Sequence, residues 1–145
     1  MYSKGETPVS QPMSDVAVRE LSPLALAFVG DGVCETLVRT ALVQNTRLAP
    51  GRLHAMAVKF VSAPGQFRIL EFLTPQLTEE ELAVVHRGKN SNKASVAKHA
   101  TPEQYRASTA FESLLGWLHL TGQQQRIEQL FDLVWQQFSP EFLQR

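Results

Sequence analysis

The feature that most constrains the fold is a mainly apolar run at residues 24–42. Its apolar residues recur every three or four positions, which is the period of an amphipathic helix rather than of a strand. At about 100° per residue, one side of this helix carries four apolar residues and two acids. These residues are Leu24, Phe28, Asp31, Glu35, Val38 and Leu42. We therefore predict a helix whose core-facing side holds two carboxylates in its middle.

Carboxylates within an apolar stripe need a partner, because burying an unpaired carboxylate is strongly disfavoured. A cation, a basic side chain or hydrogen-bond donors would serve. Gly30 and Gly32 flank Asp31, although glycine costs about 0.5–1 kcal/mol in a helix relative to alanine. Their small size would let another backbone, the water shell of a metal or a substrate approach. An acid paired with Arg or Lys is the structural alternative, but two acids one turn apart favour a chemical site.

The overall composition is that of a globular protein. The 145 residues are 43% hydrophobic and 19% charged, which is enough for one domain with a hydrophobic core. The formal net charge of zero argues against binding nucleic acid by bulk charge alone, but it allows a local basic surface. The single cysteine, Cys34, excludes a disulfide framework and a cysteine-based zinc site, and we expect it in the core.

The N-terminal segment differs from the rest of the chain. Residues 1–15 contain two prolines and scattered small polar residues, so we predict a disordered tail followed by a domain at residues 16–140. The first 20 residues mix both charges and lack the apolar core of a signal peptide. Since no apolar run reaches the length of a membrane span, we expect a cytoplasmic protein.

The remaining pattern predicts an all-α fold with six or seven helices, because no segment alternates with period two. Ser22-Pro23, Thr78 with Glu81, and Thr101-Pro102 are start signals for helices. Residues 88–100 are polar and without period, so we predict a loop there. The helices expected are at about 23–44, 49–60, 62–72, 78–87, 101–119 and 123–138.

A second acid stands out in the predicted helix at 101–119. Phe111, Leu114, Leu115 and Leu118 define its buried side, and Glu112 lies at the border of that side. A glutamate at such a border is usually just solvated, so its weight comes from pairing with an acid of the first helix. Two helices that direct carboxylates into one groove would form an oxygen-lined site suited to Mg²⁺ or Mn²⁺.

Basic residues are segregated from acids in two segments. Acids are absent between Thr36 and Leu70 and again between Leu82 and Pro102. A solvated basic surface is the simplest reading of either segment. Beside an acidic metal site, phosphate binding becomes the better one. The candidate phosphate-binding residues in the second segment are Arg87, Lys89, Asn90, Lys93 and Lys98.

Two of these segments resemble a known family. Residues 26–35 (LAFVGDGVCE) resemble the helix that marks ribonuclease III catalytic domains, and residues 109–116 (TAFESLLG) resemble its second acidic segment. The Arg87-Gly-Lys-Asn90 arrangement between them, without a further domain, is similar to the Mini-ribonuclease III branch. That branch is a stand-alone catalytic domain. The resemblance covers about residues 17–138.

The resemblance implies roles for individual residues. Asp31 and Glu112 would be the catalytic and metal-binding carboxylates, with support from Glu35. Phe28 would contact the partner subunit of an all-α homodimer. Ribonuclease III proper has carboxylates where this chain has Ala27 and Thr109. The Mini branch shares these changes, which leave the number of bound metals open.

The function implied is a Mg²⁺-dependent endoribonuclease, for which Mn²⁺ would substitute. It would cleave double-stranded RNA to leave a 5′-phosphate and a 3′-hydroxyl, and would process the large-subunit (23S) ribosomal RNA precursor in ribosome biogenesis. Two alternatives remain. One is a related fold that binds double-stranded RNA with weakened catalysis, and the other is a helical adaptor in which the acids are merely paired.

Overall fold

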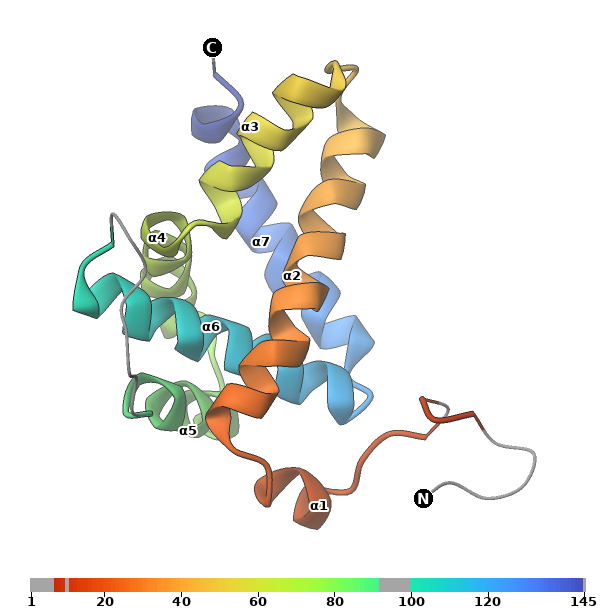
Figure 1. Cartoon of the computed structure of the whole chain (residues 1–145), viewed down its shortest axis with the longest axis vertical. Helices are drawn as coiled ribbons and strands as arrows, with labels where there is room; N and C mark the ends of the chain where they lie inside the picture. Colours follow the sequence, from red (N-terminus) through yellow and green to blue (C-terminus); the bar gives the residue numbers. More distant parts are fainter. Residues whose placement is uncertain (1–6, 10, 92–99, 145) are drawn as a thin grey trace.

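The computed structural model describes residues 7–9, 11–91 and 100–144 (Figure 1). The prediction of an all-α fold is confirmed, since the described residues contain helices and no strand. The elements are α1 (Asp15–Arg19), α2 (Pro23–Asn45), α3 (Pro50–Val61), α4 (Ala63–Leu73), the short 3₁₀ helix η1 (Thr74–Gln76), α5 (Glu79–Lys89), α6 (Pro102–Leu120) and α7 (Gln124–Phe142).

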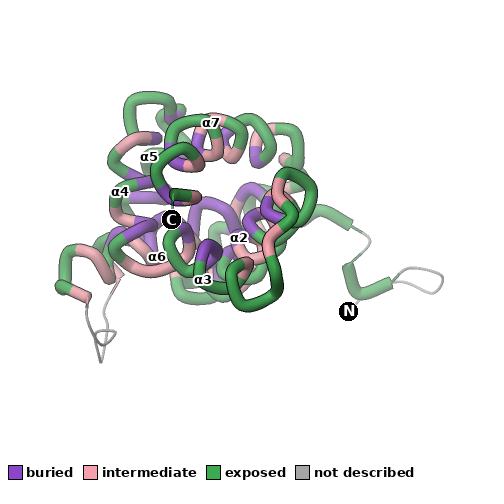
Figure 2. The backbone as a smooth tube through the Cα atoms, turned by 90° about the horizontal axis from the view of Figure 1, so that it is seen from above, coloured by how far each residue is buried: buried purple, intermediate pink, exposed green. Residues whose placement is uncertain are grey.

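Helix α6 is the centre of the bundle. It runs across the middle of the molecule and packs against α2, α4, α5 and α7 (Figure 1). Viewed from above, the buried segments of the helices lie in the interior of the bundle and the exposed ones on its outside (Figure 2). Leu114 and Leu118 of α6 are fully buried, as are Phe60 of α3 and Ile127 of α7. The predicted buried side of α6 is therefore confirmed, and the core forms around this one helix.

Local capping explains where α2, α5 and α6 begin. The Ser22 hydroxyl accepts a hydrogen bond from the Ala25 amide at 3.1 Å, and Pro23 occupies the first turn of α2. Capping boxes start α5 at Thr78 and α6 at Thr101, each with the side chain three residues on returning the hydrogen bond. Such caps satisfy amides that have no partner within the helix. The start signals in the sequence were thus interpreted correctly.

The buried side of α2 differs from the predicted one. The buried residues Leu26, Gly30, Cys34, Val38 and Leu42 are spaced by four positions. Each four-residue step advances about 40° around a helix of 3.6 residues per turn, so this stripe winds along α2. A prediction that one straight side of α2 is buried is therefore correct near the C-terminal end of the helix and wrong near its N-terminal end.

Leu24 and Phe28 show the consequence. They are 48% and 84% exposed, so their assignment to the core was wrong. The two carboxylates lie off the buried stripe as well: Asp31 is exposed and Glu35 is half-buried. Their placement in the middle of the apolar side was wrong, and the carboxylates lie at the surface of the bundle.

Helix α5 extends past its predicted end. We expected it to stop at Arg87-Gly88, but it continues to Lys89, and Gly88 is buried. A Cβ on Gly88 would stand 2.7 Å from the Cα of Ala110, which is too close for any side chain. This glycine permits close packing of α5 on α6 and does not end the helix. Part of the predicted loop at residues 88–100 is therefore helical, and residues 92–99 lie outside the described residues.

Helix α7 also runs further than predicted, through Pro140 to Phe142. Arg68 of α4 pairs with Glu141 through two contacts of 2.6 and 2.8 Å, and the Phe142 ring packs edge-on against Phe60. These contacts explain the added turn, because they give the end of α7 partners on α3 and α4.

A buried ion pair joins α5 to α7. Glu81 is 2% exposed, and both of its carboxylate oxygens accept hydrogen bonds at 2.8 Å from Arg126. Burial would by itself raise the pKa of Glu81, but the hydrogen bonds from Arg126 and Thr78 outweigh it and hold that pKa below its ordinary value. Glu81 therefore serves both the cap of α5 and the link to α7.

The start of the described chain is attached to this bundle. Met13, which falls within the predicted tail, donates its backbone amide to the carbonyl of Leu120 at 2.7 Å. Val18 of α1 is buried beside Leu26 and Val84. Across the residues that the structure describes, no helix has the length and apolar character needed to span a bilayer.

Candidate active site

The site predicted from sequence lies where α2 crosses α6. A Cβ on Gly30 would overlap the carbonyl oxygen of Glu112, and a Cβ on Gly116 would overlap that of Leu26. The two backbones are therefore in direct contact, which only glycine permits. Since Asp31 follows Gly30, this crossing places the two predicted carboxylates at the same level of the bundle.

Cys34 is buried in α2, and the charges of the predicted acids act on its thiol. The pKa of this thiol is raised to about 12, chiefly by burial; a hydrogen bond from Gln66 opposes the rise, and the negative charges of Glu112, Glu35 and Asp31 add to it. All three carboxylates thus act on one buried sulfur atom. The thiol therefore stays protonated at neutral pH.

The donor set fits a hard divalent cation. Asp31 is exposed and Glu112 is half-buried, and both offer carboxylate oxygens of the kind that Mg²⁺ prefers. Within residues 7–9, 11–91 and 100–144, no three His, Cys, Asp or Glu side chains are grouped to hold a metal ion. A metal here would need oxygen atoms from water or phosphate to complete its coordination, which is usual for Mg²⁺.

Glu35 has a different partner. Its carboxylate pairs with Arg39, one turn further along α2, at 3.1 Å. The expected support of a metal by Glu35 would require this ion pair to open. In the structure Glu35 contributes to the local charge and is held by Arg39.

The two positions that lack carboxylates are buried. Ala27 is 7% exposed and Thr109 is 6% exposed, and the Thr109 hydroxyl donates to the carbonyl of Tyr105 at 3.2 Å. The chain therefore builds its candidate site around one carboxylate from each helix.

The basic end of α5 packs on α6 near the level of Glu112. A Cβ on Gly88 would contact Ala110 and Ser113 of α6, the residues that bracket Glu112. Arg87, Lys89 and Asn90 around it are all exposed. Arg87 makes a long 3.5 Å hydrogen bond to the carbonyl of Leu21, and Asn90 bonds the ring of His86 at 3.0 Å. The predicted residues Lys93 and Lys98 lie outside the described residues.

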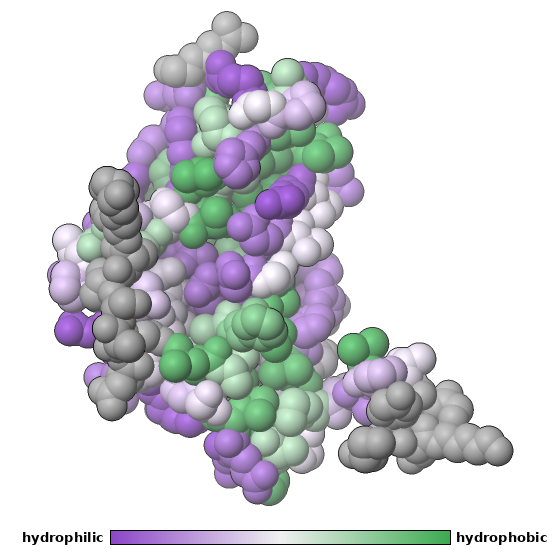
Figure 3. All heavy atoms as spheres, viewed as in Figure 1, coloured by the Kyte–Doolittle hydropathy of each residue, from purple (hydrophilic) through white to green (hydrophobic). Residues whose placement is uncertain are grey.

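Phe28 precedes Asp31 by one turn of α2. Its 84% exposure is unusual for a phenylalanine, and Leu24 nearby is also exposed. Hydrophobic side chains gather at the surface in the lower part of the molecule, where the N-terminal half of α2 lies (Figure 3). An exposed apolar surface of this kind marks an interaction site when it is contiguous.

The sequence interpretation missed Gln66. This residue of α4 is fully buried, donates to the Cys34 sulfur at 3.7 Å and accepts a hydrogen bond from the Ser108 hydroxyl. Hydrophobic periodicity does not predict a buried glutamine, because a polar side chain is normally assigned to the surface. Ser108 belongs to the polar side of α6 near Glu112, but its partner comes from a helix 42 residues earlier in the chain.

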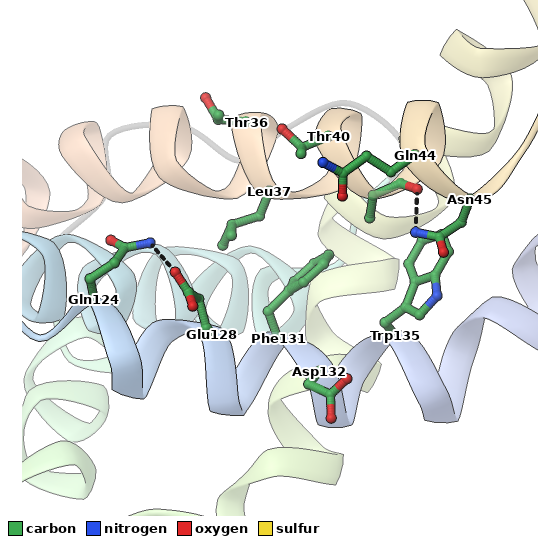
Figure 4. A pocket seen from close by; sticks show the side chains of 11 residues that line it. Thr36, Leu37, Thr40, Gln44, Asn45, Gln124, Glu128, Phe131, Asp132 and Trp135 are labelled. Carbon is green, nitrogen blue, oxygen red and sulfur yellow. Dashed lines mark hydrogen bonds between the residues drawn. The ribbon is translucent and has the colours of Figure 1, made fainter.

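A separate groove of about 500 Å³ lies between α2 and α7 (Figure 4). Leu37, Phe131 and Trp135 form its apolar part, and Glu128 and Asp132 add acids. Gln124 donates to Glu128 at 3.2 Å within it. None of the predicted site residues that the structure describes lines this groove, and its acids would repel an RNA backbone.

Known proteins resemble this chain over the region that contains both acidic segments. The family model described as "Ribonuclease III domain" matches residues 24–123, which include Asp31 and Glu112. A Brevibacillus brevis protein named Mini-ribonuclease 3 is 44% identical over 109 residues, which are 75% of this chain and 81% of that protein. The Symbiobacterium thermophilum protein of the same name is 39% identical over 125 residues, 86% of this chain and 92% of its own.

A solved structure extends the comparison to the fold. The crystal structure of a protein from Fusobacterium nucleatum superposes with a TM-score of 0.72 at 27% sequence identity. The match covers 81% of this chain and 93% of that one. The similarity therefore includes nearly the whole helical bundle.

Proposed function

The chain belongs to the ribonuclease III family, and on that basis we propose that it is a Mg²⁺-dependent endoribonuclease of double-stranded RNA. The observation that carries the proposal is the crossing of α2 and α6. There the backbone contact of Gly30 with Glu112 supports the proposal, because it sets the helix positions that carry one family carboxylate each beside one another. The exposed basic end of α5 packs on the same helix, α6, against Ala110 and Ser113.

The two carboxylates would together bind the metal ion. A Mg²⁺ ion held by Asp31 and Glu112 would lower the pKa of a bound water and stabilise charge developing on the phosphate. Asp31 is exposed and would face the RNA directly, whereas half-buried Glu112 is fixed by its place in the packed helix. Attack of water on phosphorus with departure of the 3′ oxygen would leave a 5′-phosphate and a 3′-hydroxyl.

The basic end of α5 would hold the duplex. Arg87 and Lys89 supply positive charge, and Asn90 supplies a neutral donor, all near the level of Glu112. Side chains reach A-form RNA chiefly through phosphates and 2′-hydroxyls, because its major groove is deep and narrow. These residues would therefore position the RNA and add little sequence preference.

We extend the proposal to the biological setting. The large-subunit (23S) ribosomal RNA precursor is the substrate that the resemblance to the Mini-ribonuclease III branch implies. The protein would act in the cytoplasm as a homodimer, with Phe28 in the interface. The exposure of Phe28 and Leu24 supports the dimer.

Cleavage of a long RNA duplex by purified protein, with and without Mg²⁺, tests the proposal. We expect the wild type to cleave only with the metal and to leave 5′-phosphate ends. Asp31→Asn removes the metal-binding charge at nearly constant shape, so it should reduce the rate at least about 100-fold while the melting temperature changes little. Glu35→Gln is the matched control, since the Glu35 carboxylate is held by Arg39.

The same assay separates the alternatives. Wild-type protein that binds duplex RNA in a salt-dependent manner without cleaving it would identify an RNA-binding protein with weakened catalysis. Protein that does neither would be a helical adaptor. Asp31→Asn with a near wild-type rate would remove Asp31 from the site.

A further inference from the structure

A buried hydrogen-bond chain connects three helices beneath the candidate site. The Gln66 side chain of α4 donates to the Cys34 sulfur of α2 at 3.7 Å and accepts from the Ser108 hydroxyl of α6. Gln66 and Cys34 are 0% and 3% exposed. Both ends of the buried amide are thus satisfied, and removing either partner would leave a costly unpaired group.

This chain continues the crossing that brings the carboxylates together. Along α2 and α6, Leu26 contacts Gly116 and Gly30 contacts Glu112 through backbone atoms. One turn further on each helix stand Cys34 and Ser108, which are joined through the Gln66 side chain rather than directly. The backbones of α2 and α6 are therefore in contact at Gly30 and Glu112. One turn further on, the side-chain amide of Gln66 lies between the two helices.

The two hydrogen-bond partners of the Gln66 amide each lie about one helical turn from a candidate carboxylate. Cys34 follows Asp31 by three residues, and Ser108 precedes Glu112 by four, which is about one helical turn in each case. The charges of both acids reach the Cys34 sulfur. A shift of α2 against α6 at this level would change the separation of the two carboxylates.

We propose that Gln66 is a positioning residue that holds α2 and α6 in the register needed for Asp31 and Glu112 to bind one divalent cation. The inference rests on the proposed function. A neutral amide suits this place, because it can donate to a thiol and accept from a hydroxyl without adding charge beside three carboxylates. Gln66 acts through the helices and does not touch the metal.

The test is a titration of full-length protein with Mn²⁺, followed by electron paramagnetic resonance in the absence of RNA. Gln66→Met keeps the side-chain length but cannot form hydrogen bonds. We expect it to weaken Mn²⁺ binding roughly 10-fold, as removal of supporting hydrogen bonds does at other metal sites. Ser108→Ala removes one of the two links and should weaken binding less. In cleavage assays, higher Mg²⁺ should restore part of the Gln66→Met rate, while the KM for RNA stays unchanged.

Glu81→Gln is the matched control for reduced stability. It breaks another buried polar interaction, between α5 and α7, away from α2 and α4. We expect this variant to melt at a lower temperature but to bind Mn²⁺ like the wild type. A metal affinity that falls equally in both variants would assign Gln66 a general structural role and overturn the proposal.

Two further results would also overturn it: unchanged Mn²⁺ affinity in Gln66→Met, or a wild-type protein that binds no Mn²⁺. If Gln66→Met does not fold, Ser108→Ala decides by the same criterion. The proposed function is tested separately, because a wild type that binds Mn²⁺ but cleaves no RNA would refute the cleavage activity. The Mn²⁺ titrations of the variants would still decide the role of Gln66.

Discussion

Single residues at the α2–α6 crossing show how identical residue types take different roles. Gly30 and Gly32 both flank Asp31, and the sequence gives no reason to distinguish them. A Cβ on Gly30 would overlap the Glu112 carbonyl, whereas in the described part of the chain no atom lies within 4 Å of a Cβ placed on Gly32. One glycine permits the helix contact, and the other lies in open space.

Alanine substitutions test this difference. Gly30→Ala should lower the free energy of unfolding by at least about 2 kcal/mol, because the added methyl group forces two backbones apart. Gly32→Ala should raise it by about 0.5–1 kcal/mol through the higher helix propensity of alanine. Urea unfolding at one protein concentration measures both. Equal effects of the two substitutions would mean that α2 and α6 are not in backbone contact.

At the scale of helices, α5 carries opposite charges at its two ends. Glu79, Glu80 and Glu81 lie in its first turn, and His86, Arg87 and Lys89 lie in its last, an arrangement that the helix dipole favours. The acidic end is tied to α7 through Arg126, and the basic end is exposed beside α6. One end therefore contributes stability, and the other is available for RNA.

The acidic end of α5 predicts a pH dependence of stability. The pKa of Glu81 is held below its ordinary value of 4.5, so its ion pair stabilises the fold fully above pH 4.5 and is lost as pH falls through the lower folded pKa. Glu81→Gln should cost about 1–3 kcal/mol at neutral pH, and the difference from wild type should shrink as pH falls below 4.5. Urea unfolding across this range measures it. A difference independent of pH would exclude an ionised Glu81.

The basic end of α5 predicts how RNA affinity responds to salt. Changing Arg87 and Lys89 together to alanine should weaken binding similarly for unrelated duplexes, because phosphate contacts carry no sequence information. The slope of log K against log salt should flatten by about 0.7–0.9 for each phosphate that the variant no longer neutralises. Fluorescence anisotropy at several salt concentrations measures both. An unchanged slope would place the duplex elsewhere, such as along the basic stretch from Arg39 to Arg68.

The helix starts and the packing of these elements differed in how well the sequence predicted them. Starts at Ser22, Thr78 and Thr101 were predicted because a cap is a local hydrogen bond that the neighbouring residues specify. The exposure of Leu24 and the burial of Gly88 were not predicted, because they depend on how one helix crosses another.

In the candidate site, too, some features could be predicted from local sequence and others depend on how the helices pack. Asp31 and Glu112 could be proposed from sequence because they stand in recognisable segments, and the structure brings their helices into contact. The link through Gln66 could not be found, because it joins residues from three helices far apart in the sequence. The apolar stripe predicted a buried Asp31, and that part of the prediction was wrong, since the carboxylate is exposed.

At the scale of the whole molecule, the unexplained feature is the apolar surface around the N-terminal half of α2 (Figure 3). Phe28 is 84% exposed, more than an aromatic side chain in a soluble monomer usually is. The residue lies one turn from Asp31, so an interface there would bring two candidate sites near each other. This arrangement would suit a substrate with two antiparallel strands.

We therefore predict a dimer that depends on Phe28. Phe28→Asp would place an unpaired charge in a desolvated interface, and each 1.4 kcal/mol or so by which binding weakens raises the dissociation constant about tenfold. Light scattering coupled to size exclusion should show a dimer for the wild type and a monomer for the variant, with duplex cleavage falling in parallel. Val43→Asp is the matched control, because Val43 is 60% exposed near the other end of α2 and should tolerate the charge. A dimer that survives Phe28→Asp but not Val43→Asp would move the interface to the C-terminal half of α2, away from Asp31.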